Sequence, residues 1–238
     1  IDAITDDGQY HAWTEINVPQ RPFEIENVDT VTVPLAQSGY TTEYLRYRIT
    51  INDRPNETNY YRIVIDKQTT LWGYNHEEGG DDYIYWTKHS YNFIGREDVV
   101  LTDGQPTTGD DEDNGLFDTA KNIYGVFDDT RFRNTSYTMT VYNNTKIETG
   151  SDSGYFSGMD VIIRLMSITE TEYYYLKALN LVDSDAYDET INEPIKYPSN
   201  VHGGTGMVGI STEVTQTIHI ISSSHSKGNL APPVHVYQ

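Results

Sequence analysis

Three glycines near the end of the chain have the spacing of a dinucleotide-binding loop. Gly204, Gly206 and Gly209 match G-x-G-x-x-G, a loop that holds a pyrophosphate between a buried strand and the N-terminus of a helix. The flanking residues differ from that arrangement, because turn-forming "YPSN" precedes the loop and β-branched "ISTEVTQTIHII" follows it. We therefore predict a glycine-rich turn that leads into a strand, and we do not predict a nucleotide site.

An acidic stretch further upstream offers oxygen ligands for a hard cation. Asp110, Glu112 and Asn114, followed by Gly115, imitate the first half of an EF-hand calcium loop. The twelfth position is Lys121 and not a bidentate Glu, which excludes a true EF-hand. A loose Ca²⁺ site at Asp110, Glu112 and Asn114 is the sharper interpretation, and a solvated acidic loop is the simpler one. We expect no other cofactor.

One short stretch is rich in aromatic side chains. Its members are Trp72, Tyr74, Tyr83, Tyr85 and Trp86. Rings presented on a sheet can stack on sugar faces or peptide side chains, and their polar tips add hydrogen bonds. Strand alternation puts Tyr83 and Tyr85 on one face and Trp86 on the other, so at least one set is expected to be buried. We predict this stretch as the candidate site for a glycan or peptide ligand.

Motifs of hydrolytic enzymes are missing from the sequence. There is no G-x-S-x-G, since "GSDSG" has Asp152 in place of the central serine, and no H-E-x-x-H. The seven histidines are scattered, and cysteine is absent, which excludes disulfides and thiolate chemistry. A pair of carboxylates for glycoside hydrolysis has no recognisable spacing. We therefore do not predict an enzyme, and a glycan-processing hydrolase is kept as an alternative.

Charge and length limit the partners of the chain. The 238 residues include 16 Lys and Arg against 36 Asp and Glu, which gives a formal net charge of −20. Such a chain repels phosphate backbones and anionic lipid surfaces, so nucleic acid is not expected as a partner. No apolar run approaches the length of a membrane span.

Period-two alternation dominates the chain and predicts strands. In Tyr44–Asn52 the residues Leu45, Tyr47, Ile49 and Ile51 share one face. Asn59–Lys67 repeats the pattern, and the intervening "DRPNET" contains turn formers, which predicts a hairpin between the two strands. Further strands are predicted at Asp81–His89, Ser136–Asn143, Asp160–Ile168 and Glu213–Ile221.

A single segment has the pattern of a helix. Over Ile168–Val182, Thr169 and Glu172 have the spacing of a capping box, and Tyr175, Leu176, Leu179 and Val182 fall on one face. We expect that face to pack on the sheet. The predicted fold is mainly β, an antiparallel β-sandwich or barrel-like domain with one packed α-helix at about residues 169–182.

Four motifs, in order, resemble those of a known family. They are "NYYRIVI", "GVFDDTRF", "IRLMSITETEYYYLKALN" and "YPSNVHGGTGMVGI". Together they resemble the Bacteroidetes outer-membrane lipoprotein family called domain of unknown function 4249, over about Tyr44 to Ile221. The resemblance implies a lipid-anchored, surface-exposed protein of the outer membrane. It also implies a nutrient-uptake role beside a TonB-dependent importer of the starch-utilisation type.

The resemblance also implies a domain organisation. Residues 1–26 would be the last strand and linker of an upstream immunoglobulin-like domain, and residues 27–238 the main β-rich domain. The family's lipid-anchor cysteine and signal peptide are not part of this sequence, so membrane attachment would be through an anchor outside it. The expected function is non-catalytic, either ligand binding or assistance to the importer. A structural or assembly subunit of a surface complex is the main alternative.

Overall fold

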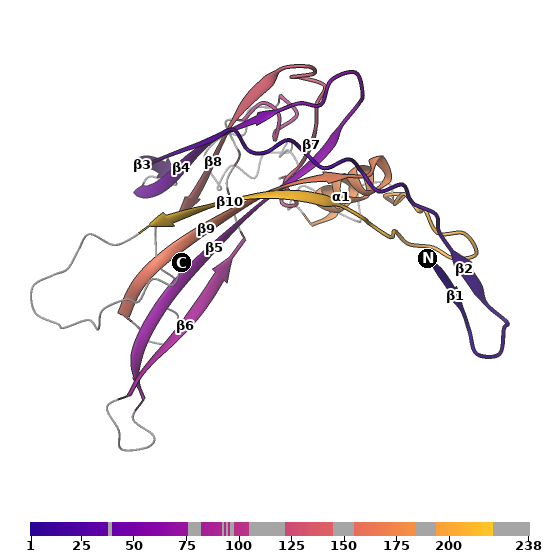
Figure 1. Ribbon diagram of the computed structural model, residues 1–238, viewed down its shortest axis with the longest axis horizontal. Coiled ribbons are helices and arrows are strands. Elements are labelled where there is room, and N and C mark those ends of the chain that lie inside the picture. Colours follow the sequence, from indigo (N-terminus) through magenta and orange to yellow (C-terminus); the bar gives the residue numbers. More distant parts are fainter. Residues whose placement is uncertain are drawn as a thin grey trace, which may run out of the picture.

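The described part of the chain folds into antiparallel β-sheets with one helix (Figure 1). The structure is a computed structural model that describes residues 1–37, 40–75, 82–91, 93, 95, 98–104, 122–144, 155–183 and 194–220. No described sheet closes into a barrel, since each has two ends in its strand order. The prediction of a mainly β, sandwich-like fold with one helix is therefore confirmed.

The larger sheet has five strands and is built around β5. Its order is β10-β9-β5-β6, and the short β7 pairs with the start of β5 on the same side as β6. These strands are β5 (Tyr60–Asn75), β6 (Asp82–Ser90), β7 (Val126–Asp128), β9 (Tyr155–Ile168) and β10 (Thr212–Ile220). The register between β5 and β9 shifts between Thr70 and Leu71, which marks a β-bulge there.

A smaller sheet of three strands faces the larger one. Its order is β3-β4-β8, with both pairings antiparallel. The strands are β3 (Asn27–Gln37), β4 (Tyr40–Asn52) and β8 (Ser136–Asn144). Figure 1 shows this sheet above the long curved strands of the larger one.

Alternate residues of the two sheets meet in a common core. The smaller sheet contributes Tyr47, Ile49, Ile51, Met139 and Val141, and the larger contributes Tyr61, Ile63, Ile65, Val161, Ile163 and Leu165. Each of these side chains is at most 2% exposed. The predicted inward faces of Tyr44–Asn52 and Asn59–Lys67 are thus confirmed, and their burial is the main apolar contribution to stability.

The hairpin predicted between these two strands is wrong. β4 pairs with β3 and β8, whereas β5 lies in the larger sheet, so Asp53–Asn59 crosses from one sheet to the other. The alternation of apolar residues is the same for two strands of one sheet and for two strands that face each other across a core. The sequence pattern therefore could not distinguish the two arrangements.

The helix α1 (Glu170–Val182) follows β9 directly. Thr169 is its N-cap and accepts a hydrogen bond from the Glu172 amide at 3.2 Å, which confirms one half of the predicted capping box. The other half is wrong, because the Glu172 carboxylate lies against Gly209 and not at the Thr169 amide. The apolar face differs slightly from the prediction, because Tyr173 and Leu176 are buried while Tyr175 is only half-buried. Tyr173 and Leu176 pack with Val126 of β7 and Ile168 of β9, so the helix covers the end of the larger sheet.

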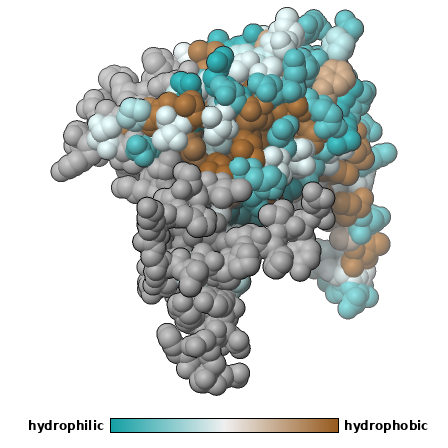
Figure 2. All heavy atoms as spheres, turned by 60° about the vertical axis from the view of Figure 1, so that its left-hand side comes forward, coloured by the Kyte–Doolittle hydropathy of each residue, from teal (hydrophilic) through white to brown (hydrophobic). Residues whose placement is uncertain are grey.

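The first 26 residues form an arm beside the two sheets. Strands β1 (Asp2–Ile4) and β2 (His11–Trp13) pair with each other, and an extended linker leads from them to β3. Figure 2 shows hydrophobic residues on the fainter arm at its right, where Ile1, Ile4 and Val18 are exposed. Whether this arm belongs to an upstream immunoglobulin-like domain stays a prediction.

Candidate binding face

The two faces of β5 have different surroundings. Its odd-numbered residues from Tyr61 to Ile65 enter the core, so its even-numbered residues lie on the opposite side of the larger sheet. There, Tyr60 and Met166 pack against the helix cluster around Tyr173. Beyond them, no described helix or strand covers the even-numbered positions from Val64 to Trp72. We call these positions, with the positions paired to them on β6, β9 and β10, the outer face.

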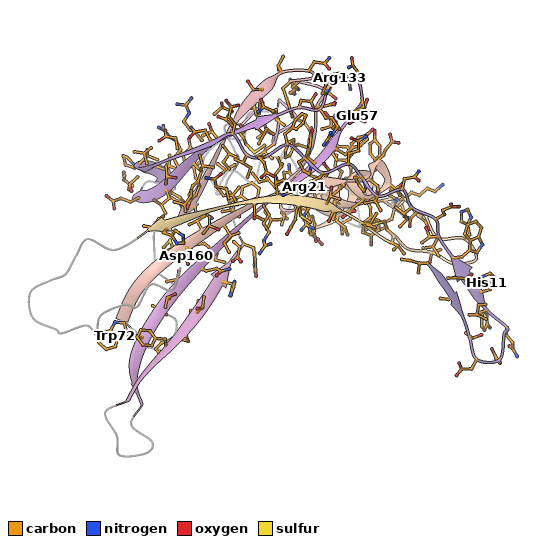
Figure 3. The ribbon with its side chains drawn as sticks, viewed as in Figure 1. His11, Arg21, Glu57, Trp72, Arg133 and Asp160 are labelled. Carbon is orange, nitrogen blue, oxygen red and sulfur yellow. The ribbon has the colours of Figure 1, made fainter. Side chains whose placement is uncertain are left out.

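Aromatic residues occupy the far end of the outer face. Trp72 pairs with Tyr85, and the next positions along the same face, Tyr74 and Tyr83, pair with each other. Figure 3 labels Trp72 near that end of β5. The Trp72 side chain is 6% exposed, whereas Tyr85 is 50% exposed. Of this pair, Tyr85 is therefore the ring that is presented to solvent.

The fifth predicted aromatic residue lies on the other face. Trp86 pairs with buried Leu71, and its ring covers Gly73, where a Cβ atom would approach Trp86 Cη2 to 3.1 Å. The prediction that Tyr83 and Tyr85 share one face and Trp86 takes the other is consistent with this register. The binding role of Trp72, Tyr74, Tyr83 and Tyr85 stays a prediction, and Trp86 is set apart from them.

A row of polar residues crosses the outer face at one level of the sheet. His89 pairs with Gln68, Gln68 with Asp160, and Asp160 with His219, so four strands each contribute one member. Asp66, the next outer position of β5, accepts a hydrogen bond from Gln68 Nε2 at 2.7 Å and contacts His89 Nδ1 at 3.0 Å. We call these five residues the outer-face row.

The outer-face row contains two His–Asp pairs. His219 Nδ1 lies 2.7 Å from Asp160 Oδ1, and both side chains are largely exposed. Asp66 is only 3% exposed, but His89 beside it is half-exposed. The hydrogen-bonding contacts within the row join side chains to side chains. The exposed pair of His219 and Asp160 contributes little to stability, so its groups can exchange each other for the hydroxyls or amides of a bound molecule.

The helix end of the outer face contains a buried acid. Glu172 is 9% exposed, and its carboxylate lies against Gly209, where a Cβ atom would meet Glu172 Oε2 at 2.8 Å. Burial raises the pKa of Glu172, while the positive charge of Arg62 and the Ile210 amide partly oppose that rise. Oε2 has no hydrogen-bond partner among the described residues.

The glycine-rich segment forms the predicted turn. No helix begins at Gly206, and the next element is strand β10 at Thr212. Gly203 and Gly206 have positive φ angles of 76° and 129°, which glycine adopts readily. Asn200 fastens the turn with both ends of its amide, donating to the Val208 carbonyl and accepting from the Val208 amide, each at 2.9 Å.

The turn also holds the N-terminal arm. Trp13 and His202 exchange backbone hydrogen bonds of 3.0 and 2.8 Å, and their rings stack at 4.2 Å between centroids. Thr14 donates its hydroxyl to the Asn200 carbonyl at 2.6 Å. The glycine-rich segment therefore attaches the N-terminal arm to the main sheets, which is a structural role.

A shallow open depression lies on the smaller sheet. It has a volume of about 310 Å³ and is lined by Asn27, Val28, Asp29, Arg48, Thr50 and Thr138. Thr50 and Thr138 hydrogen-bond each other at 2.9 Å, and Asp29 pairs with Arg48 in the strand register. It is mostly polar and lacks described aromatic side chains, so we give it less weight than the outer face.

The predicted calcium ligands fall outside the described residues. Asp110, Glu112 and Asn114 lie there, so the structure does not test that hypothesis. Within the described part of the chain, no three histidine or acidic side chains are grouped closely enough to hold a metal ion. Also within that part, the single helix is too short and too polar to be a candidate membrane span.

Comparison with known proteins identifies the family. A family model described as a domain of unknown function (DUF4249) matches residues 1–217. The chain belongs to this family. The DUF4249 match begins at the N-terminal arm and therefore spans both the arm and the main sheets. No curated protein and no solved structure was found to match the chain.

One DUF4249-like motif has a structural role that the geometry explains. In "GVFDDTRF", Gly125 has a φ of 66°, and a side chain there would collide with the Ile63 carbonyl oxygen. Asp128 accepts hydrogen bonds from Thr130 and Tyr173. Although burial alone would raise the pKa of Asp128, these bonds outweigh it and hold the pKa below its usual value. The motif thus joins β7 to the helix.

Sequence reasoning missed the outer-face row. Its histidines are far apart in the chain and were part of a scattered set of seven. Only the register of four strands brings His89 and His219 onto one level of one face. The sequence shows only that His89, Asp160 and His219 each occupy a polar position in a strand where polar and apolar residues alternate, which does not indicate that they lie together.

Proposed function

We propose that this DUF4249 chain is a non-catalytic binding module that holds a nutrient ligand, a glycan or a peptide, on its outer face. The ligand would pass to a neighbouring TonB-dependent importer in the outer membrane, where the protein is displayed through a lipid anchor. The observation that carries the proposal is the half-exposed Tyr85 ring on the same sheet face as the outer-face row, a face that no described helix or strand covers at these positions.

The chemistry of that face suits an uncharged polar ligand. An aromatic ring supplies a flat apolar contact, and His89, Gln68, Asp160 and His219 supply both donors and acceptors at one level of the sheet. Each acid of the row has a histidine within hydrogen-bonding distance, so the row combines donors and acceptors that a polar ligand can use. The net charge of −20 further disfavours polyanionic ligands.

Binding can be tested with a panel of neutral oligosaccharides and peptides, measured by isothermal titration calorimetry on the purified chain. We expect a ligand from the panel to bind, and the Tyr85→Ala variant to bind about tenfold more weakly, a loss of about 1.4 kcal/mol. Tyr10→Ala is the matched control, since Tyr10 is 73% exposed on the arm. Equal losses in both variants, or wild-type affinity in Tyr85→Ala, would contradict the proposal.

The importer is tested separately. The full-length lipidated protein would be used to capture partners from native outer membranes. Recovery of a TonB-dependent importer supports the second half of the proposal. Recovery of the protein alone, together with turnover of the glycan panel, would favour the alternative of a glycan-processing hydrolase.

A further inference from the structure

The last strand of the larger sheet has an open edge whose orientation can be derived. β10 pairs with β9 on one side, and no described strand pairs with its other side. Arg21 Nε donates a hydrogen bond to the Glu213 carbonyl at 3.0 Å, which shows that this carbonyl points away from β9. In an antiparallel strand the N–H and C=O of one residue point to the same side and alternate along the chain. Glu213, Thr215, Thr217 and His219 therefore direct their backbone groups outward.

A second observation gives the same phase independently. The Ile63 amide donates to the Gly125 carbonyl beside β7. The backbone N–H and C=O groups of odd-numbered residues of β5 therefore point away from β9, and those of even-numbered residues point toward it. Val64 pairs with Arg164. The backbone groups of even-numbered residues of β9 therefore point toward β5, and those of odd-numbered residues point toward β10. Leu165 pairs with Val214, so the backbone groups of Val214 point toward β9 and those of Glu213 and Thr215 point toward the open edge.

The linker covers only the start of this edge. Thr212 donates its hydroxyl to the Pro19 carbonyl at 3.2 Å, and Arg21 covers Glu213. Figure 3 labels Arg21 beside the start of β10. Within the described chain, the outward N–H and C=O groups of Thr215, Thr217 and His219 remain without a backbone partner. These three residues form what we call the free edge.

The free edge lacks the features with which proteins usually block strand addition. The sequence of β10, "TEVTQTIHI", has no lysine and no proline, and the same is true of the edge strand β8. The edge strands β3 and β6 in contrast contain Pro34 and Lys88. Edge prolines, lysines and bulges prevent pairing with another chain. Their absence from β10 leaves this edge able to accept a strand.

The neighbouring core indicates what kind of strand would fit. Ile218 and Ile220 on β10 and Val28 on β3 are only partly buried against the common core. A strand added beside β10 would place every second side chain on the core side, next to Ile218 and Ile220. Apolar residues at alternate positions would therefore extend the core. A net charge of −20 favours a basic segment and disfavours a second copy of the same chain.

We propose that the free edge at Thr215, Thr217 and His219 accepts an extended basic segment of a partner protein as an additional strand. The segment would have apolar residues at alternate positions. This interaction goes beyond the proposed nutrient binding, because it uses the backbone edge of β10 and not the outer face. It would give the protein a docking site for another component of a surface assembly.

Two proline variants test the orientation of the edge. Thr217→Pro removes an outward N–H, so the folded chain should keep nearly its wild-type melting temperature. Gln216→Pro removes an inward N–H that belongs to the ladder with β9, so its melting temperature should fall clearly. The opposite order of melting temperatures would overturn the derived phase and the proposal with it.

The strand addition is tested with a synthetic nine-residue peptide in which valine alternates with lysine and threonine. Binding is measured by fluorescence anisotropy, and amide hydrogen exchange is followed by NMR in the wild-type chain. We expect the peptide to bind and the exchange of the Thr215, Thr217 and His219 amides to slow by about tenfold, a protection typical of newly paired edges. A peptide with glutamate in place of lysine, and one interrupted by proline, should bind much more weakly.

The outcomes separate this proposal from its rivals. Absence of peptide binding, protection elsewhere in the chain, or unchanged peptide affinity in Thr217→Pro would each overturn it. A dimer in analytical ultracentrifugation that Thr217→Pro abolishes would assign the edge to a second copy instead. Because Tyr85→Ala leaves the edge untouched, it should bind the peptide like wild type, so the two proposals fail independently.

Discussion

Two sets of acidic side chains in this protein differ in what they bind. Asp53, Asp98 and Asp129 are at most 6% exposed, and their partners include backbone amides. We call them the backbone-bound carboxylates. Asp66 and Asp160 of the outer-face row instead contact histidine and glutamine side chains. Aspartate therefore fixes loop conformations in one region and lies among polar side chains on a sheet face in the other.

The partners determine what each set can do. A backbone amide cannot leave its carboxylate without moving the chain, so the first set fixes loop conformations. For example, Asp53 accepts from the Asn134 amide at 2.8 Å and from the Tyr61 hydroxyl at 3.1 Å, and so fastens the crossing between β4 and β5. In the second set Asp160 is about half exposed and can turn toward a ligand while the backbone stays in place, whereas Asp66 is 3% exposed and is reached through His89 and Gln68. The first set therefore stabilises the fold, and the second set is the one on which the proposed binding depends.

The largest effect is expected from Asp98→Ala. Asp98 accepts from the Val100 and Leu101 amides at 3.0 and 3.2 Å, from the Thr140 amide at 2.8 Å, and from the Tyr137 hydroxyl. Removing the carboxylate leaves these buried donors without an acceptor. We expect the free energy of unfolding to fall by about 3 kcal/mol or more, measured by urea denaturation.

The control for that variant is Asp29→Ala. Asp29 is exposed on the smaller sheet, so its removal should change the free energy of unfolding by less than about 0.5 kcal/mol. If Asp98→Ala were as stable as Asp29→Ala, the distinction between backbone-bound and side-chain-bound carboxylates would lose its main support.

Much of the fold could be predicted from local pattern. The strands containing Ile49, Ile63 and Ile163 and the helix that begins after Thr169 follow from alternation and capping. The crossing between β4 and β5 could not be predicted, because period two says which side a residue faces but not which strand lies beside it. Pairing partners are set by contacts between residues far apart in the chain.

An intermediate effect is expected from Glu172→Gln, at the border of the two regions. Burial raises the pKa of Glu172 in the folded chain above its unfolded value. Protonated Glu172 is thus favoured by folding, so its contribution to stability is fully present below the unfolded pKa and is lost as pH rises through the folded pKa. Glu172→Gln should therefore be more stable than wild type at pH 7.

The difference in stability between Glu172→Gln and wild type should shrink as the pH falls below the ordinary pKa of glutamate. Thermal unfolding of both proteins at a series of pH values measures this. Lys177→Gln is a suitable control, because its ammonium group is partly exposed and pairs with exposed Asp103. If the difference in stability between Glu172→Gln and wild type stayed constant from neutral to acidic pH, the buried Glu172 carboxylate would not be what destabilises the folded wild-type protein.

The candidate site could be predicted only in part. A cluster of rings around Trp72 and Tyr85 is visible in the sequence, because both strands of the ladder lie in one stretch. The outer-face row combines residues from β5, β6, β9 and β10, and its level is fixed by three strand registers. A shift of one residue in any of them would move its member to the core face.

The smallest effect on stability is expected from Asp160→Ala. Its carboxylate contacts His219 at 2.7 Å, but about half of the Asp160 side chain and most of His219 are exposed. An exposed pair of this kind contributes little, so the free energy of unfolding should change by less than about 0.5 kcal/mol in urea denaturation. Ligand affinity should fall in the same variant, because the row loses an acceptor. A variant that is strongly destabilised would place Asp160 with the backbone-bound carboxylates, and the distinction between carboxylates that stabilise the fold and those proposed to bind a ligand would then fail.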